Sequence, residues 1–142
     1  MKKALKLAYK AGNEGEVPIG AVIVLNGVVI ASAYNKRNLS KDASAHAEIL
    51  AIRKACKKVG DWRLEDAEMY VTLEPCPMCS GAIVNSRIKK VYFGAYERKS
   101  GAVMSNYRIL FSGSLNHKVD AEGGILENEC SEVLKKFFKE KR

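Results

Sequence analysis

Residues 69–84, with the sequence MYVTLEPCPMCSGAIV, decide the fold of this chain. The first five residues form an apolar run typical of a short β-strand, and the last three belong to the interior of a helix. The two prolines between them mark the end of the strand and the start of the helix, because proline is favoured at a first helical position. The run VYFG at residues 91–94 predicts the next strand. The segment is therefore a βαβ unit, with Glu74 and Cys76 at the carboxyl end of its first strand.

A β-hairpin is predicted upstream of this unit. Two apolar runs, residues 19–25 and 28–34, are separated by Asn26-Gly27, the pair that supplies both positive-φ residues of a type I′ turn. An opening helix over residues 3–13 is expected to bury one face, and a final helix has apolar residues at helical spacing. The inward residues predicted for these two helices are Leu5, Ala8 and Tyr9, and Cys130, Val133, Leu134, Phe137 and Phe138. Together these elements predict an α/β chain with a mixed sheet between helical layers.

A further helix is predicted to begin after Ser44, which is a good N-cap residue. Its apolar stripe would bury one face, and His46 would fall in its first turn. Residues two apart do not share a face in mid-helix, so His46 and Glu48 can approach one ion only if this first turn lies end-on to the site. The predicted stripe consists of Ala45, Ile49, Ile52, Cys56 and Val59.

Three residues of types that bind zinc, with a carboxylate beside them, suggest a catalytic metal centre. Catalytic zinc takes three protein ligands and leaves the fourth position open, and His46, Cys76 and Cys79 would supply three. Cysteines three apart on a helix share a face, and a helix N-terminus favours their ionised form. A redox dithiol, or two thiols that only fill space, are the alternatives for this pair. For His46 and Glu48 considered alone, capping or core contacts are the alternative.

The composition is that of a single domain, residues 1–142, without repeats, low-complexity tracts or a linker. No apolar run is long enough to cross a membrane, and no signal peptide is recognisable, so a cytoplasmic protein is expected. Cys56 and Cys130 lie on apolar helix faces and are expected in the core. The net charge of +8 favours polyanionic partners, although a lysine-rich solvated surface would give the same balance.

The pattern His46-x-Glu48 followed by Pro75-Cys76-x-x-Cys79 resembles that of the zinc nucleobase deaminases. The closer resemblance is to the bacterial tRNA-specific adenosine deaminases, and it covers essentially the whole chain. It is carried by GEVPIGAV at residues 15–22, AHAEI at 45–49, YVTLEPC at 70–76, SRI at 86–88, NHKV at 116–119 and GIL at 124–126. This resemblance implies a three-layer α/β/α cytidine deaminase-like fold with a central mixed sheet of about five strands.

The resemblance also implies a role for each site residue. His46, Cys76 and Cys79 would hold one Zn²⁺ per subunit, which would generate a hydroxide from bound water. Glu48 would shuttle protons while this hydroxide attacks C6 of adenine, so that ammonia leaves and inosine remains. Asn35 and the backbone of Ala47 would bind the base, although Asn35 alone would be interpreted as a turn residue.

The implied substrate is the wobble adenosine of a tRNA anticodon, with an arginine tRNA expected, and the implied assembly is a homodimer. A free nucleobase or nucleoside deaminase of the guanine or cytosine type would use the same zinc chemistry without a phosphate-binding face. A non-catalytic zinc-stabilised RNA-binding module is the third reading. His117 has no metal role in the family, so a structural hydrogen bond is expected for it. Glu97 replaces the aspartate usual in the family segment near the RNA, which affects the expected RNA contact and not the reaction.

Overall fold

The computed structural model describes residues 1–113 and 115–141, which form a five-stranded mixed sheet flanked by helices. The strand order is β2-β1-β3-β4-β5, with β1 antiparallel to both β2 and β3, and with β3, β4 and β5 parallel. The elements along the chain are α1 (Lys2–Asn13), β1 (Gly20–Leu25), β2 (Val28–Tyr34), α2 (Arg37–Ser40), α3 (Ala47–Val59), β3 (Glu68–Leu73), α4 (Pro77–Asn85), β4 (Lys90–Ala95), the 3₁₀ turn η1 (Ile109–Phe111), β5 (Asp120–Glu122) and α5 (Glu127–Lys141).

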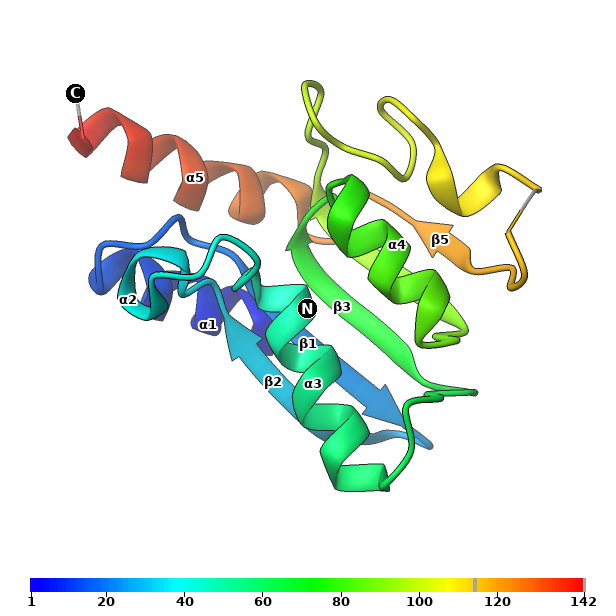
Figure 1. The fold of residues 1–142 in the computed structure, drawn as a ribbon. Coiled ribbons are helices and arrows are strands. Elements are labelled where there is room, and N and C mark those ends of the chain that lie inside the picture. Colours follow the sequence, from blue (N-terminus) through cyan, green and yellow to red (C-terminus); the bar gives the residue numbers. More distant parts are fainter. Residues whose placement is uncertain (114, 142) are drawn as a thin grey trace.

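The helices form two layers, one on each face of the sheet, so the predicted α/β/α architecture is confirmed. Helices α3 and α4 lie across the front of the sheet in Figure 1, whereas α1 and α5 lie behind it. The predicted βαβ unit is β3-α4-β4, and the predicted hairpin is β1-β2. Its turn has φ of +52° at Asn26 and +78° at Gly27, as a type I′ turn requires.

The helices approach the sheet closely because alanine and glycine form much of the contact. Ala47, Ala51 and Ala55 are fully buried along α3, whereas Val59 is 39% exposed, so the predicted stripe was shifted from the true inward face. The same error occurred in α1, where Ala4, Ala8 and Ala11 are fully buried and Tyr9 is exposed. The inward prediction was wrong for Tyr9 and Val59, whereas Ile52 and Cys56 pack partly buried against the core. Small side chains take the innermost positions because they permit a shorter distance between helix and sheet.

Two glycines in the sheet allow α1 and α5 to approach the face that these two helices cover. A Cβ at Gly20 would lie 2.1 Å from the backbone oxygen of Ala4, and one at Gly94 would lie 2.4 Å from Sγ of Cys130. Helix α1 therefore lies directly on β1, and α5 lies directly on β4. Cys130 is buried as predicted, but Phe138 near the end of α5 is 47% exposed.

The beginning of α3 differs from the prediction. Helix α3 begins at Ala47, and His46 is its N-cap residue, with φ −74° and ψ 152°. Ser44 does not cap the helix, because its hydroxyl donates to Oδ1 of Asp42 at 2.7 Å. His46 thus lies just before the first helical turn instead of within it.

None of the helices in the described part of the chain combines the length and the apolar character needed to cross a bilayer.

Candidate metal centre

The three predicted ligands meet where two helices begin. His46 precedes α3, Cys76 precedes α4, and Cys79 lies in the first turn of α4. Nδ1 of His46 is 3.7 Å from Sγ of Cys76 and 3.5 Å from Sγ of Cys79, and all three candidate ligand atoms lie within 4.8 Å of one another. Both helices direct the positive ends of their dipoles toward this point, which favours thiolates.

The chemistry of these donors fits a soft divalent cation such as Zn²⁺, which is bound by imidazole and thiolate groups. A hydrogen bond from the Cys79 thiol lowers the pKa of Cys76 to about 4, even though burial opposes that change. The same hydrogen bond, together with burial, raises the pKa of Cys79. One thiolate is thus already favoured, and a bound cation would take the place of the proton between the two sulfurs. With three protein ligands, a coordination position is left for water or substrate.

Glu48 is a buried carboxyl group beside this cluster. It is the second residue of α3 and only 4% exposed, and its Oε1 has no hydrogen-bond partner among the described residues. Burial raises the pKa of Glu48 from 4.5 to about 7. A carboxyl group that titrates near neutrality can both take up and release protons, as a general acid–base catalyst must.

A cavity of about 140 Å³ adjoins the cluster. Its volume suits a single planar base. The cavity lies at the carboxyl ends of β3 and β4, where α/β folds place their ligands. The lining residues are Ile19, His46, Glu48, Leu73, Glu74, Cys76, Glu97 and Ser100.

Asn35 and Ala47, the residues predicted to bind the base, do not belong to the cavity lining. Asn35 follows β2 and is 3% exposed; its amide donates to the carbonyl of Val17 at 3.4 Å, while its Oδ1 has no partner in the described part of the chain. Ala47 is fully buried as the first residue of α3. An unpaired buried acceptor is costly, so the Oδ1 of Asn35 is available for a ligand.

Glu97 connects this cavity to a larger groove. The groove has a volume of about 650 Å³, shares Leu73 and Glu97 with the cavity, and runs along α5. It combines aromatic and basic side chains from α5 and from the residue that follows β4, namely Tyr96, Phe138, Lys135 and Lys139. Such a combination suits single-stranded nucleic acid, whose bases stack on aromatic rings and whose phosphates bind cations.

The second histidine plays a different part. The Nε2 of His117 lies 2.8 Å from the carbonyl oxygen of Ile88 and donates to it. His117 therefore makes the structural hydrogen bond expected for it, and it is not part of the His46, Cys76 and Cys79 group.

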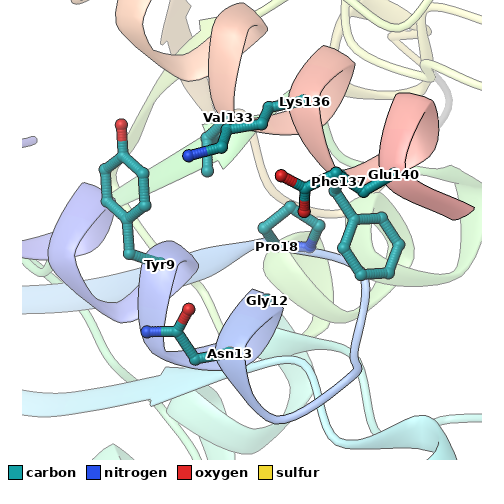
Figure 2. A pocket seen from close by; sticks show the side chains of 8 residues that line it. All are labelled: Tyr9, Gly12, Asn13, Pro18, Val133, Lys136, Phe137 and Glu140. Atoms are coloured by element: carbon teal, nitrogen blue, oxygen red, sulfur yellow. The ribbon is translucent and has the colours of Figure 1, made fainter.

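A separate cavity of about 300 Å³ lies between α1 and α5 (Figure 2). Its charged side chains, Lys136 and Glu140, both come from α5, and none of the candidate ligands reaches it. Its other lining residues are Tyr9, Gly12, Asn13, Pro18, Val133 and Phe137. This cavity is therefore distinct from the metal centre.

The sequence did not reveal the hydrogen-bonding roles of two buried carboxylates, although it placed Glu74 at a strand end. Glu16 is 1% exposed and accepts from the backbone N–H groups of Asn38 and Leu39 in α2, at 3.1 and 2.7 Å. Glu74 is 2% exposed and accepts hydrogen bonds from the loop that follows β4. No local pattern marks either residue, because their partners lie more than twenty residues away in the chain.

Comparison with known proteins agrees with this geometry. The family model of MafB19-like deaminases matches residues 1–142. The tRNA-specific adenosine deaminase of Bacillus subtilis (strain 168) is 51% identical over 142 residues, covering 100% of this chain and 88% of that protein. A solved structure from biochemical and structural studies of A-to-I editing by tRNA:A34 deaminases at the wobble position of transfer RNA superposes with a TM-score of 0.92. It is 47% identical, and the match covers 94% of this chain and 97% of the other.

A guanine deaminase from Bacillus subtilis is a more distant structural neighbour, with a TM-score of 0.65 and 48% identity over a match covering 67% of this chain and 61% of that one. The tRNA-specific adenosine deaminase of Bacillus subtilis, by contrast, matches this chain at 51% identity over its full 142 residues. The chain belongs to the tRNA-specific adenosine deaminases, within the MafB19-like deaminase family.

Proposed function

We propose that this chain is a zinc-dependent hydrolase that converts adenosine to inosine at the wobble position of a tRNA anticodon, with arginine tRNA as the substrate. The observation that carries the proposal is the convergence of His46, Cys76 and Cys79 beside the buried carboxyl group of Glu48, whose Oε1 has no partner among the described residues. Family membership supports the same chemistry. The proposed catalytic unit is a single deaminase domain, residues 1–142.

His46, Cys76 and Cys79 would hold one Zn²⁺ per subunit. When bound, the ion supplies Lewis acidity that lowers the pKa of a water to about 7 and so provides a hydroxide nucleophile. Glu48 takes the two protons of the attacking water in turn, and delivers one to the ring nitrogen and the other to the departing amine. One C–O bond forms at C6 as one C–N bond breaks, and the products are inosine and ammonia.

Asn35 and the backbone of Ala47 would bind the adenine base. The Oδ1 of Asn35 is buried and has no partner among the described residues, so it can accept from a base N–H. Ala47 is the first residue of α3, and its N–H has no acceptor within the helix. A base bound by the N–H of Ala47 would lie close to Glu48, the next residue of α3.

The choice of RNA is supported by the groove along α5 and by the net charge of +8. Anticodon-loop bases are unpaired, so turning one into a 140 Å³ cavity costs little compared with opening a duplex. The related solved structure comes from work on enzymes that edit this position.

We also propose a cytoplasmic homodimer. Tyr107, Phe111 and Leu115 are 68%, 43% and 44% exposed, next to a 440 Å³ hollow lined mainly by apolar side chains. An exposed apolar surface of this kind is typical of an interface. A reducing compartment would keep the two thiols of the metal centre available as ligands.

The decisive experiment measures inosine formation by zinc-loaded protein on an arginine-tRNA anticodon stem-loop with a wobble adenosine. Free adenosine, cytidine and guanine serve as parallel substrates. Activity on the stem-loop alone is the expected result. Activity on a free base or nucleoside alone overturns the substrate assignment and leaves the zinc mechanism intact.

Guanine deamination is the second candidate, because a guanine deaminase shares 48% identity with this chain over the matched part. That activity needs no phosphate contacts, so its turnover would be insensitive to salt.

A further inference from the structure

Glu74 carries an unusual number of hydrogen bonds for one side chain. Its Oε1 accepts from the N–H of Glu97 at 3.1 Å and from the hydroxyl of Ser105. Its Oε2 accepts from the N–H groups of Val103, Met104 and Ser105 at 3.2, 2.7 and 2.8 Å. All five donors belong to residues 97–105, named here the rim loop, which lies beyond the carboxyl end of β3 (Figure 1).

The fit between this carboxylate and the rim loop is close. A Cβ at Gly101 would lie 2.5 Å from the carboxyl carbon of Glu74 and 2.3 Å from the backbone oxygen of Glu97. Glycine is therefore required where the loop passes the carboxylate. The N–H of Ala102 donates to the carbonyl of Pro75 at 2.8 Å, which ties the loop to the same strand end.

The rim loop in turn forms part of the reaction cavity. Glu97 and Ser100 line the cavity together with His46, Glu48 and Cys76. Glu97 also lines the groove along α5. A shift of the loop would thus alter the wall that faces a bound base, while the three candidate metal ligands come from other elements.

We propose that Glu74 is a positioning residue whose buried carboxylate holds the rim loop as the substrate-facing wall of the cavity. The predicted effect of Glu74 on turnover rests on the proposed deaminase function. Glu74 also lines the cavity, but both of its carboxylate oxygens accept hydrogen bonds from the rim loop. It acts through Glu97 and Ser100, so it governs how a substrate is held and not how protons move.

A carboxylate is needed because every partner is a donor. Glutamine keeps one acceptor oxygen, but it turns an NH₂ group toward backbone N–H groups and loses the negative charge that strengthens these bonds. Glu74→Gln should therefore release the loop with little change in side-chain volume. Glu74→Asp keeps the charge with a shorter reach and should restore part of the effect.

The first readout is limited trypsin digestion, because Arg98 and Lys99 are exposed within the rim loop. A protease needs a locally unfolded segment, so hydrogen bonds that hold the loop slow cleavage there. Glu74→Gln should be cut at Arg98 or Lys99 at least tenfold faster than the unsubstituted protein. Glu16→Gln is the matched control, since it makes the same change at a similarly buried carboxylate that holds a different segment. Its cleavage at Arg98 and Lys99 should be unchanged.

The second readout is the split between KM and kcat on the substrate that the unsubstituted protein accepts, measured on zinc-loaded protein. Glu74→Gln should lower kcat/KM at least tenfold, mainly through KM, with zinc content unchanged. If Glu74→Gln does not fold, Ser105→Ala removes one donor, and a smaller change in the same direction is expected. Unchanged cleavage at Arg98 and Lys99 contradicts the proposal, as does a loss of activity that follows loss of zinc.

These results are separable from the proposed function. Activity of the unsubstituted protein on a free base, and not on the stem-loop, would refute the tRNA assignment alone. Cleavage rates in the rim loop and the KM for that free base would still decide the role of Glu74.

Discussion

Glu48→Gln should abolish turnover while leaving the metal bound. General acid–base catalysis by a positioned side chain contributes about 10² to 10⁴ in rate, and Glu48 would move protons to two different atoms. We therefore expect a loss of at least about 10³, or about 4 kcal/mol of transition-state stabilisation. Glutamine has the same shape but cannot take a proton from water. The three candidate ligands are other residues, so zinc content should not change.

The same substitution should stabilise the metal-free protein. Burial raises the pKa of Glu48 from 4.5 to about 7, so the folded state disfavours the ionised form. This penalty is absent below about pH 4.5, grows as the pH rises toward 7, and is complete above it. The two pKa values correspond to about 3 kcal/mol at pH 8, which Glu48→Gln removes. The expected rise in Tm is therefore up to about 10 °C, and it should shrink as the pH falls toward 5.

The assay combines inosine formation, zinc content and thermal unfolding after chelation, each at pH 5 and pH 8. Glu16→Gln is the control, because both oxygens of Glu16 already accept backbone N–H groups. The glutamine amide would accept from only one of these two N–H groups, so Glu16→Gln should lower the free energy of unfolding by about 1 to 3 kcal/mol. Normal turnover in Glu48→Gln, or a Tm at pH 8 below that of the unsubstituted protein, would refute the roles assigned to this carboxyl.

Three further outcomes are expected. His46→Ala should lose zinc and turnover together, and chelation of the unsubstituted protein should stop turnover until zinc is restored, as metal analysis and inosine assays would show. Gly94→Ala should lower the free energy of unfolding in urea by at least about 2 kcal/mol, because the new Cβ would lie 2.4 Å from Sγ of Cys130. Gly81→Ala, whose Cβ would have nothing within 4 Å, should raise it by up to about 1 kcal/mol. Stem-loop affinity should fall steeply with salt, with a log–log slope of about −0.7 per phosphate contact; a flat titration would contradict RNA binding through the backbone.

The strands and the metal ligands were predictable because their signals are local. Short apolar runs predicted β1 to β4, and Asn26-Gly27 predicted the hairpin turn. Two cysteines three residues apart lie where prolines mark the start of α4, and the strand order brings them close to the histidine that precedes α3. The short β5 had no comparable signal, because it is only three residues long and its outer residues are exposed.

The inward faces of α1 and α3 were predicted only in part: Ala8 is buried as expected, but Tyr9 and Val59 are exposed. Hydrophobic periodicity favours large side chains, but these helices approach the sheet through alanines. The distance between two layers is a property of both surfaces, and one helix alone does not reveal it. The prediction of Ser44 as the N-cap residue of α3 was also wrong, because its hydroxyl donates to the carboxylate of Asp42 instead.

The role of Glu74 was beyond sequence reasoning for a different reason. Its strand-end position was predicted, but its five donors lie 23 to 31 residues further along the chain in a loop without regular structure. Only the fold brings them together.

The attachment of the rim loop has a consequence for protein engineering. Four of the five bonds to Glu74 come from backbone N–H groups, which every residue except proline offers. A transplanted loop with another sequence can therefore adopt the same position, provided that it keeps the small residue at Gly101 and the spacing of those donors. Grafting this segment between deaminases offers a route to new substrate preferences that leaves His46, Cys76 and Cys79 unaltered.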